Sequence, residues 1–405
     1  MTRLAAPTPG LETAWVAEHL GDLLEGPVRA SRSFRGGQSA ADAALDAAPV
    51  AGYAARRNEV WPPSRRGATR LSPYIRHGLL TLPRVWAHAA GGPPRDVARL
   101  RDELLWQEYA RHLYARTGGS SSSLRYEVRE RGGDRAAWDD DVASMACLGL
   151  VVDELVQDGW MVNQARMWTA SHWTVRRGLG WRDGDDLLFR NLLDGSRAAN
   201  RLGWQWTAGA GTGKPYGFSR WQVEKRAPGV CEGCGLRRAC PIQSWPSETS
   251  LRPVDEVPGV RRDLDPAATA GPREPEGDGP VDAVWITAES LGDDDPALLA
   301  HPDAPAVFVW DEALLRRLRL SSTRLVFLAE CLADLATRRE VRVHLGDPAA
   351  ELAGARVATT YAPVPGWRRR AASIDPAVVH PWPWLVRPHG GPAGSFTAWR
   401  RAARV

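Results

Sequence analysis

Hydrophobic positions in the first part of the chain follow a helical spacing. Across residues 97–116 and 148–173, apolar side chains recur at intervals of three and four residues, as they do on one face of an α-helix. The same spacing extends from about residue 11 to residue 245. It predicts a large all-helical domain over 11–245.

The pattern changes after residue 280. Short apolar, β-branched runs at 281–288, 305–311 and 341–346 are typical of buried strands, and 322–339 has helical spacing. Strands that alternate with helices predict a parallel, Rossmann-like α/β domain over 281–405.

The segment 246–280 separates these two patterns. It is rich in Pro, Gly and acidic residues and poor in large apolar ones, which predicts an exposed linker. A length of 405 residues also favours two domains, because single cores stop growing at about 250 to 300 residues.

Composition adds one unusual feature, which is 19 Trp residues in an otherwise ordinary globular chain. The formal net charge of +4 is too small to indicate a polycation that binds nucleic acid by charge alone. The N-terminal segment does not resemble a signal peptide, and no run of about 18 apolar residues occurs. We therefore expect a cytoplasmic protein that does not enter a membrane.

Three cysteines lie close together, as Cys231, Cys234 and Cys240 in the spacing C-x2-C-x5-C. In a reducing compartment, this spacing favours a metal site over a disulfide framework, although free thiols remain an alternative. Cys331 falls in a predicted helix, where we expect a buried apolar role.

Two short stretches offer candidate binding chemistry. Thr69, Arg70 and Ser72 could donate hydrogen bonds to a phosphate, or Thr69 or Ser72 could cap a helix that starts near Pro73. Glu103 and Trp106 are three residues apart, so an acid and an aromatic plate share one helical face. The alternative for this pair is a core tryptophan beside a solvated carboxylate.

Six motifs in order connect these stretches: YAARRNEVWP, ATRLSPYIRHGLLTLPRVW, ELLWQEYARHL, GWMVNQARMWTASHW, LLDGSRAANRLGWQW and GTGKPY. With them the first domain resembles the photolyase and cryptochrome family. The resemblance implies a helical domain that holds FAD in a folded, U-shaped conformation. It assigns cofactor contacts to Tyr53, Thr69, Leu71, Ser72, Arg166, Asp194, Ser196 and Asn200. Among these, Arg166 and Asp194 would pair against the flavin, and the Asn200 amide would face its N5 atom.

The resemblance also implies a relay of tryptophans that carries electrons to the flavin. Trp204 would be the member next to the flavin and Trp181 the middle one. Tyr126 and Trp138 are both candidates for the outer member.

Similarity to dimer photolyases implies UV-damaged DNA as the partner and repair of cyclobutane pyrimidine dimers as the activity. Glu103 would hydrogen-bond the dimer and stabilise its radical anion. The residues that would complete the pocket are Arg57, Trp106, Asn163, Met167 and Trp206. Val162 and Met167 stand where photolyases for the six-four lesion carry histidines, which argues against that substrate.

Two departures keep other functions open, because Gln107 and Gln164 occupy positions where dimer photolyases commonly carry Arg. One alternative is a blue-light receptor of the cryptochrome type without repair activity. A binding module with structural cofactors is another. The sequence does not predict an oligomeric state.

The family resemblance extends to the cysteines. Cys147 lies before the GWMVN motif, where iron–sulfur bacterial photolyases carry a cluster ligand, and would join Cys231, Cys234 and Cys240 around a [4Fe–4S] cluster. Zinc bound by the same four thiolates is the alternative.

The α/β segments resemble the domain with which photolyases usually begin, so the chain has the features of a circular permutation. In the family this domain often binds an antenna chromophore. Here the loop 287–295, TAESLGDDD, is acidic where the family is usually rich in Arg, so an antenna and its identity are not predicted.

Overall fold

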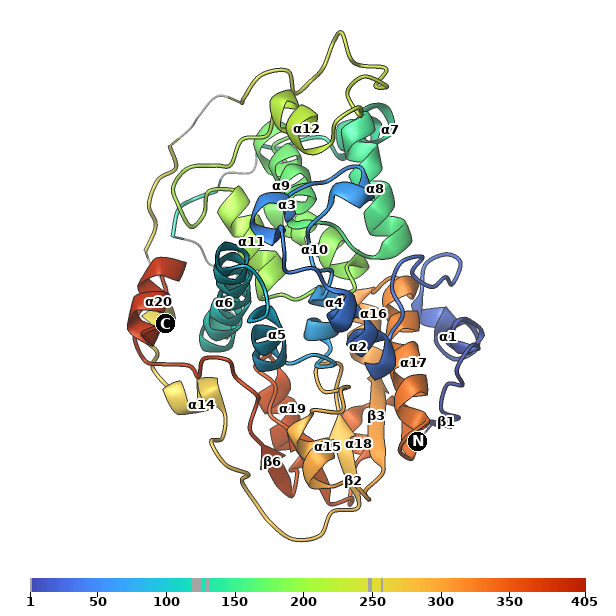
Figure 1. The fold of residues 1–405 in the computed structure, drawn as a ribbon. Coiled ribbons are helices and arrows are strands. Elements are labelled where there is room, and N and C mark those ends of the chain that lie inside the picture. Colours follow the sequence, from blue (N-terminus) through green and yellow to red (C-terminus); the bar gives the residue numbers. More distant parts are fainter. Residues whose placement is uncertain (1, 119–124, 129–130, 247–249, 256–257) are drawn as a thin grey trace.

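The computed structural model describes residues 2–118, 125–128, 131–246, 250–255 and 258–405 (Figure 1). Before residue 246 the chain is mainly helical. Its helices are α1 (Glu12–Leu20), α2 (Gln38–Ala47), α3 (Tyr53–Arg56), α4 (Ser72–Arg76), α5 (Leu82–Ala89), α6 (Pro94–Thr117), α7 (Arg135–Ser144), α8 (Ala146–Asp158), α9 (Asn163–Ser171), α10 (Trp181–Asn191), α11 (Ala199–Thr207) and α12 (Arg220–Arg226). Helix α9 continues into a π-helical turn at His172–Arg176.

The C-terminal part forms a sheet with helices between its strands. The strands are β2 (Ala283–Ile286), β3 (Ala306–Asp311), β4 (Val341–Gly346), β5 (Val357–Thr360) and β6 (Val378–His380), and the helices are α15 (Pro296–Ala300), α16 (Glu312–Leu318), α17 (Ser322–Ala336), α18 (Pro348–Glu351), α19 (Trp367–Ile374) and α20 (Phe396–Ala403). Strands β2 to β6 pair in parallel. The predicted fold class, an all-helical part and a Rossmann-like α/β part, is confirmed.

A strand from the other end of the chain completes one edge of this sheet. β1 (Thr2–Leu4) pairs antiparallel with β4, so within the described residues the strand order is β1-β4-β3-β2-β5-β6. Helix α1 packs against α17 (Figure 1). The sheet is therefore mixed, whereas we predicted it to be parallel. Three residues are too few to show the alternation that identifies a strand.

The two faces of the sheet enter different cores. On β2, Val284 and Ile286 belong to a large core that includes α17 and many helices of the first part. Ala283 and Trp285 point to the opposite face, into a smaller core with side chains of α19. Because side chains alternate along a strand, one sheet joins the helical part to an outer layer.

The segment predicted as a linker, 246–280, contains the short helices α13 (Pro258–Arg261) and α14 (Pro266–Ala270), and both contact α6. Arg116 of α6 anchors this region because its guanidinium pairs with the buried Asp263 at 3.3 Å. The same guanidinium donates to the carbonyl oxygens of His389 and Gly391. Buried polar contacts thus hold a segment that has few large apolar residues.

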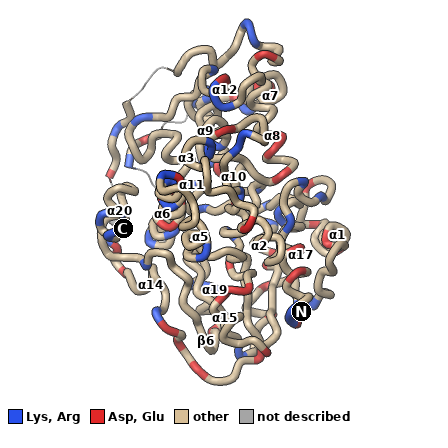
Figure 2. Tube along the Cα trace, in the orientation of Figure 1, with Lys and Arg blue, Asp and Glu red and all other residues tan. Residues whose placement is uncertain are grey.

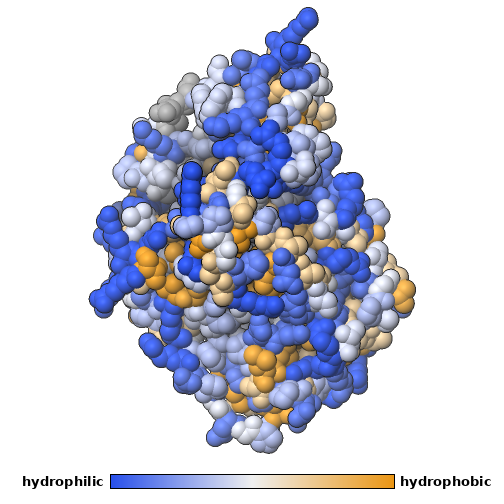
Figure 3. All heavy atoms as spheres, viewed as in Figure 1, coloured by the Kyte–Doolittle hydropathy of each residue, from blue (hydrophilic) through white to orange (hydrophobic). Residues whose placement is uncertain are grey.

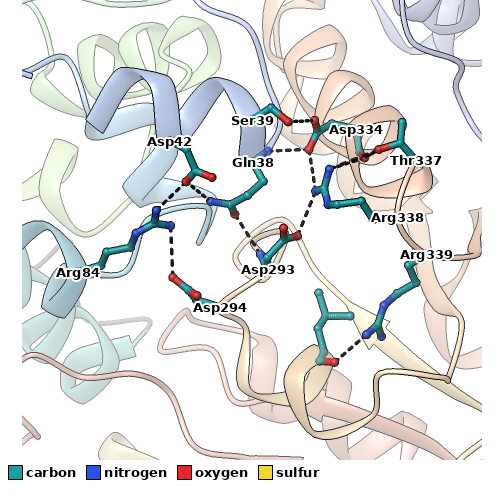
Figure 4. Close-up of polar contacts among 11 residues, drawn as sticks. Gln38, Ser39, Asp42, Arg84, Asp293, Asp294, Asp334, Thr337, Arg338 and Arg339 are labelled. Carbon is teal, nitrogen blue, oxygen red and sulfur yellow. Dashed lines mark hydrogen bonds and ion pairs between the residues drawn. The ribbon is translucent and has the colours of Figure 1, made fainter. Parts of the chain in front are cut away.

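The acidic loop between β2 and α15 is bound to the helical part through ion pairs (Figure 4). Asp293 pairs with Arg338 at 3.1 Å, and its N–H donates to the side-chain oxygen of Gln38. Asp294 lies 3.4 Å from Arg84, which also binds Asp42. Two of the acidic side chains that we expected to repel anionic ligands, Asp293 and Asp294, are therefore each paired with an arginine.

None of the helices in the described residues is both long and apolar enough to cross a membrane.

Candidate cofactor and substrate site

The predicted cofactor residues lie on α3, on α4 and the turn before it, on α9 and in the segment between α10 and α11. Helices α9, α10 and α11 contact one another, and Trp160, just before α9, is hydrogen-bonded to Ser72 of α4. Basic positions recur around α6, α9, α12 and α20, with acidic positions among them (Figure 2).

Arg166 and Asp194 form the ion pair that the resemblance predicts. Arg166 Nη2 lies 2.7 Å from Asp194 Oδ2, and Arg166 Nε donates to the carbonyl oxygen of Met161. The Asp194 side chain is 6% exposed, and its other oxygen, Oδ1, is buried without a hydrogen-bond partner. A buried acceptor without a donor is costly, so this site fits a bound group with N–H or O–H donors such as FAD.

The loop that carries Asp194 is fixed by two arginines. Arg76 Nε donates to the carbonyl oxygen of Gly195 at 3.1 Å, and Arg324 Nη2 donates to the same oxygen at 3.2 Å. A Cβ at Gly195 would lie 2.6 Å from the Arg324 guanidinium. The loop can approach α17 this closely only because this position is glycine.

The hydroxyl groups of Thr69 and Ser72 lie in the turn before α4 and at the first residue of this helix. Helix α4 begins at Ser72, and Leu71, which precedes it, makes no side-chain capping bond. Ser72 Oγ instead accepts a hydrogen bond from Trp160 Nε1 at 3.1 Å. Thr69 and Ser72 are both half-buried, whereas Leu71 is buried. The capping alternative for this stretch is therefore wrong, and the contacts of Thr69, Leu71 and Ser72 with a cofactor stay predictions.

Tyr53 is the first residue of α3 and packs against Ala89 and Leu100. Burial raises the pKa of its phenol well above the ordinary range, and Glu103 contributes to the same shift. The hydroxyl therefore stays protonated and can donate a hydrogen bond. Asp96 holds the start of α3, since its carboxylate accepts the N–H groups of Gly52 and Ala54.

Asn200 lies one helical turn after Ser196, to whose carbonyl oxygen its backbone N–H donates at 2.9 Å. The side-chain NH2 of Asn200 donates to the carbonyl and carboxylate oxygens of Asp185. Burial raises the pKa of Asp185, and Arg197 and Arg201 oppose this shift. Since its NH2 group is occupied, Asn200 can offer its amide oxygen to a cofactor.

Three tryptophan rings form a continuous buried series. The ring of Trp204 lies 6.4 Å from that of Trp173, and Trp173 lies 5.0 Å from Trp138. Each of the three is 2% exposed. Trp138 was one of the two predicted outer members, whereas Trp173 was given no role, although it stands in the quoted motif ending in ASHW.

The other predicted relay members are placed differently. Trp181 begins α10, is 1% exposed, and has a buried indole N–H without a partner. Tyr126 lies near Gly213, where an added Cβ would meet its ring at 2.9 Å. The ring series that starts at Trp204 thus leads through Trp173 to Trp138.

The predicted substrate residues include two local pairs. Arg57 Nε donates to Glu103 Oε1 at 3.1 Å, and Asn163 Nδ2 lies 3.7 Å from the sulfur of Met167. The Arg57 and Glu103 side chains are 22% and 37% exposed. The acid is therefore held in place by a cation but remains open to solvent.

The two predicted stacking residues, Trp106 on α6 and Trp206 on α11, are both 38% exposed, whereas most tryptophans of this part are buried. Trp206 lies 5.5 Å from the ring of Tyr216. The Tyr216 hydroxyl accepts hydrogen bonds from Gln164 and Gln222. Exposed indoles beside polar groups suit the stacking of a base.

The four cysteines predicted as metal ligands meet in one pocket. Cys147 of α8 and the three cysteines after α12 line it together with Met145, Val230, Leu236 and Ile242. Burial raises the pKa of the Cys147 thiol to about 12, and the three other cysteines add to the shift. In the described part of the chain, no three such side chains lie close enough together to hold a single metal ion.

The pocket brings together the four cysteines that the sequence singled out, and Arg220 and Arg237 also line it. Cysteine thiolates are the ligands of [4Fe–4S] clusters and of structural zinc. The two arginines would offset part of the negative charge of the thiolates.

Comparison with known proteins identifies the class of this site. Residues 100–226 match the FAD binding domain of DNA photolyase. The deoxyribodipyrimidine photo-lyase of Vibrio cholerae is 34% identical over 170 residues, which are 38% of this chain and 36% of that protein. A deoxyribodipyrimidine photo-lyase of Thermus thermophilus is 30% identical over 240 residues, 56% of this chain and 55% of that protein.

A crystal structure of a bacterial class III photolyase from Agrobacterium tumefaciens is also similar, with a TM-score of 0.39 at 23% identity over 51% of this chain and 42% of that one. The chain spans between 36% and 55% of the length of the two curated relatives described above. The predicted resemblance to the photolyase and cryptochrome family is confirmed. Residues 100–226 of the helical part are similar to the FAD binding domain of DNA photolyase.

Proposed function

We propose that this protein is a light-dependent flavoenzyme that splits cyclobutane pyrimidine dimers in DNA. The observation that supports it best is the arrangement on α6, where Glu103 is bound by Arg57 and Trp106 keeps part of its indole exposed. An acid and an aromatic plate on one open helical face suit a base that has left the duplex.

FAD, when bound in its reduced form, supplies the excited-state electron that opens the cyclobutane ring and receives it back afterwards. The donor atoms that would hold it belong to Arg166, Asp194, Tyr53 and the turn 69–72. Ser196 and Asn200 would complete the site. Asp194 Oδ1 is the acceptor that such a ligand would satisfy.

Glu103 would hydrogen-bond the carbonyl and N–H edge of the dimer. Arg57 fixes its orientation and provides positive charge near the radical anion formed on the substrate. Trp106, Trp206, Asn163 and Met167 would surround the two bases. The dimer would gain one electron, the C5–C5 and C6–C6 bonds between the two bases would break as the C5=C6 double bond of each base forms again, and the electron would leave with no net change.

The tryptophan series would deliver electrons to the cofactor site. We assign Trp204 as its inner member, Trp173 as its middle member and Trp138 as its outer member, because their rings follow one another at 6.4 and 5.0 Å. Trp181 remains a second candidate for the middle position.

The four cysteines would hold a [4Fe–4S] cluster with a structural role. It would tie α8, in the middle of the helical part, to the loop after α12. Zinc bound by the same four cysteines, which line one pocket, stays the alternative.

The second candidate function is a blue-light receptor of the cryptochrome type. It is favoured by Gln164, which is 8% exposed and bound to the Tyr216 hydroxyl, so that it cannot contact a DNA phosphate as an exposed Arg would.

A variant of Glu103 tests the repair function. We expect Glu103→Ala to lower repair of a thymine-dimer oligonucleotide at least tenfold while FAD content stays unchanged. Glu224→Ala, which removes an exposed partner of Arg220, is the matched control and should leave repair unchanged. Equal repair by Glu103→Ala would contradict the assigned role, and light-driven reduction of FAD without repair in the unaltered protein would favour the receptor.

A further inference from the structure

The exposed indole of Trp106 is covered on one side by the last helix of the chain. Phe396, the first residue of α20, stacks on it with ring centroids 4.3 Å apart and an interplanar angle of 13°. Tyr109 meets it edge-on at 5.6 Å and 77°. The indole nevertheless stays 38% exposed, so part of it remains open to solvent.

Phe396 is itself held in place by the packing of α20 on α6. Its ring stacks against Trp399 at 5.9 Å and 24°. Trp399 is fully buried, and its indole N–H donates to His112 Nδ1 at 2.8 Å. The phenyl ring above Trp106 therefore belongs to a rigid group of aromatic side chains.

Polar contacts fix α20 along the same face of α6. The Tyr109 hydroxyl donates to the carbonyl oxygen of Ala393 at 2.9 Å, just before the helix. Farther along, Arg400 pairs with Asp102 at 2.7 Å. Apolar residues gather on the surface over α5 and α6 next to α20 (Figure 3). The C-terminal helix thus lies beside the predicted substrate residues although it is far from them in the chain.

A tryptophan on a helix surface ordinarily samples several rotamers, and the loss of this side-chain freedom is a cost of binding a ligand to it. Stacking on a second aromatic ring favours one orientation of the indole. A partner that already covers one face removes that cost before the ligand arrives. The part of the indole that stays exposed is then available to a further flat ring.

We propose that Phe396 is a positioning residue of the substrate site, which holds the Trp106 indole in place so that a nucleobase stacks on its open face. This inference rests on the proposed function for the identity of the ligand. The chemical class that fits is an extrahelical pyrimidine pair, because it presents a ring face to Trp106 and hydrogen-bonding groups to the neighbouring Glu103.

The test is a double-mutant cycle in binding. We would measure the dissociation constant for a short DNA strand with one central thymine dimer, in darkness, by fluorescence anisotropy. Phe396→Ala should weaken binding about three- to tenfold, whereas Phe396→Tyr should change it less than about twofold. In a Trp106→Ala background, Phe396→Ala should have no further effect.

Arg401→Ala, on the exposed side of the same helix, is the matched control and should bind as the unaltered protein does. FAD content and the repair rate at saturating DNA should stay constant in all Phe396 variants. Unchanged binding by Phe396→Ala, or equal losses in both backgrounds, would overturn the proposal, because a general structural role predicts the second result.

A second readout separates this proposal from the proposed function. The acrylamide quenching of Trp106 is obtained as the difference between each protein and its Trp106→Phe counterpart. Phe396→Ala should increase this quenching at least twofold without any DNA. If the unaltered protein does not bind the dimer strand, the repair function fails, and the quenching alone decides whether Phe396 positions Trp106.

Discussion

Arg324 on α17 donates hydrogen bonds to the backbone carbonyl oxygens of Phe189 and Gly195, which precede and follow the turn that carries Asp194. Its side chain is buried, and this burial lowers its pKa to about 9, so the guanidinium remains charged at neutral pH. A residue of the α/β part therefore shapes the cofactor loop of the helical part. The α/β part is more than a cover for the FAD-binding domain.

Replacement of Arg324 tests this coupling. Arg324→Met would remove the donor of the buried Phe189 carbonyl oxygen, whereas the Gly195 oxygen would keep its bond from Arg76. We expect a free energy of unfolding lower by about 1 to 3 kcal/mol, measured by urea unfolding, and FAD binding weaker by at least tenfold, measured by flavin fluorescence. Arg316→Ala removes an exposed pair with Glu312 and should change neither quantity. Normal FAD affinity in a folded Arg324→Met protein would contradict the coupling between α17 and the loop that carries Asp194.

Sequence patterns predicted the helical and α/β parts because long amphipathic helices and buried strands have clear periods. They did not predict that β1, at the start of the chain, would pair with β4 of the C-terminal sheet. They also did not predict that the polar segment 246–280 would pack on α6 through Arg116. Both features depend on a few contacts between residues that are distant in the chain, and the local pattern of hydrophobic positions does not predict such contacts.

The tryptophan series leads to a prediction about light-driven reduction of FAD. Trp173→Phe should slow photoreduction in the presence of a thiol at least tenfold, because phenylalanine is much harder to oxidise than tryptophan. The measurement is the loss of flavin absorbance near 450 nm under blue light. Trp310→Phe, a buried tryptophan of the sheet, is the control. If Trp181→Phe slows photoreduction strongly and Trp173→Phe does not slow it, Trp181 would instead be the middle member.

The cysteine pocket predicts a specific loss of metal. Cys147→Ser should reduce bound iron and the absorption near 400 nm of anaerobically purified protein to less than a fifth. Cys331→Ala alters a buried thiol on α17 and should keep the full iron content. Elemental analysis decides between the metals, since stoichiometric zinc without iron would contradict the cluster.

A pH dependence follows from Glu108, which is fully buried and whose backbone partner is the N–H of Val386. Burial raises the pKa of Glu108 to about 7, against the opposing effect of Arg111. The folded state therefore keeps a proton that the unfolded state releases above its pKa of about 4.3. This contribution to stability is complete at low pH and is lost as the pH rises through 7.

Glu108→Gln removes this dependence. Relative to the unaltered protein, the variant should gain stability between about pH 5 and pH 8, by an amount on the order of 3 kcal/mol. Urea unfolding at the two pH values measures it. Burial also raises the pKa of Glu330 and Asp295, so the comparison between variant and unaltered protein isolates Glu108. If the two proteins differ in free energy of unfolding by the same amount at both pH values, the raised pKa of Glu108 would be contradicted.

The site could be predicted only where motifs mark it. Arg166 pairs with Asp194 as the resemblance implies, and the four cysteines line one pocket, whereas the contact of Arg57 with Glu103 was not predicted. Trp173, Arg324 and Phe396 carry no motif for their roles. Each contributes through a neighbour that is remote in the chain, and only the folded structure shows that neighbour.

Repair by the photoreduced protein is the decisive experiment for the proposed function. Thymine-dimer oligonucleotide is incubated with it anaerobically in blue light and in darkness, and restored thymine absorbance near 260 nm is recorded. We expect recovery in light and none in darkness. Full photoreduction of FAD with no recovery in either condition would show that the protein does not repair dimers.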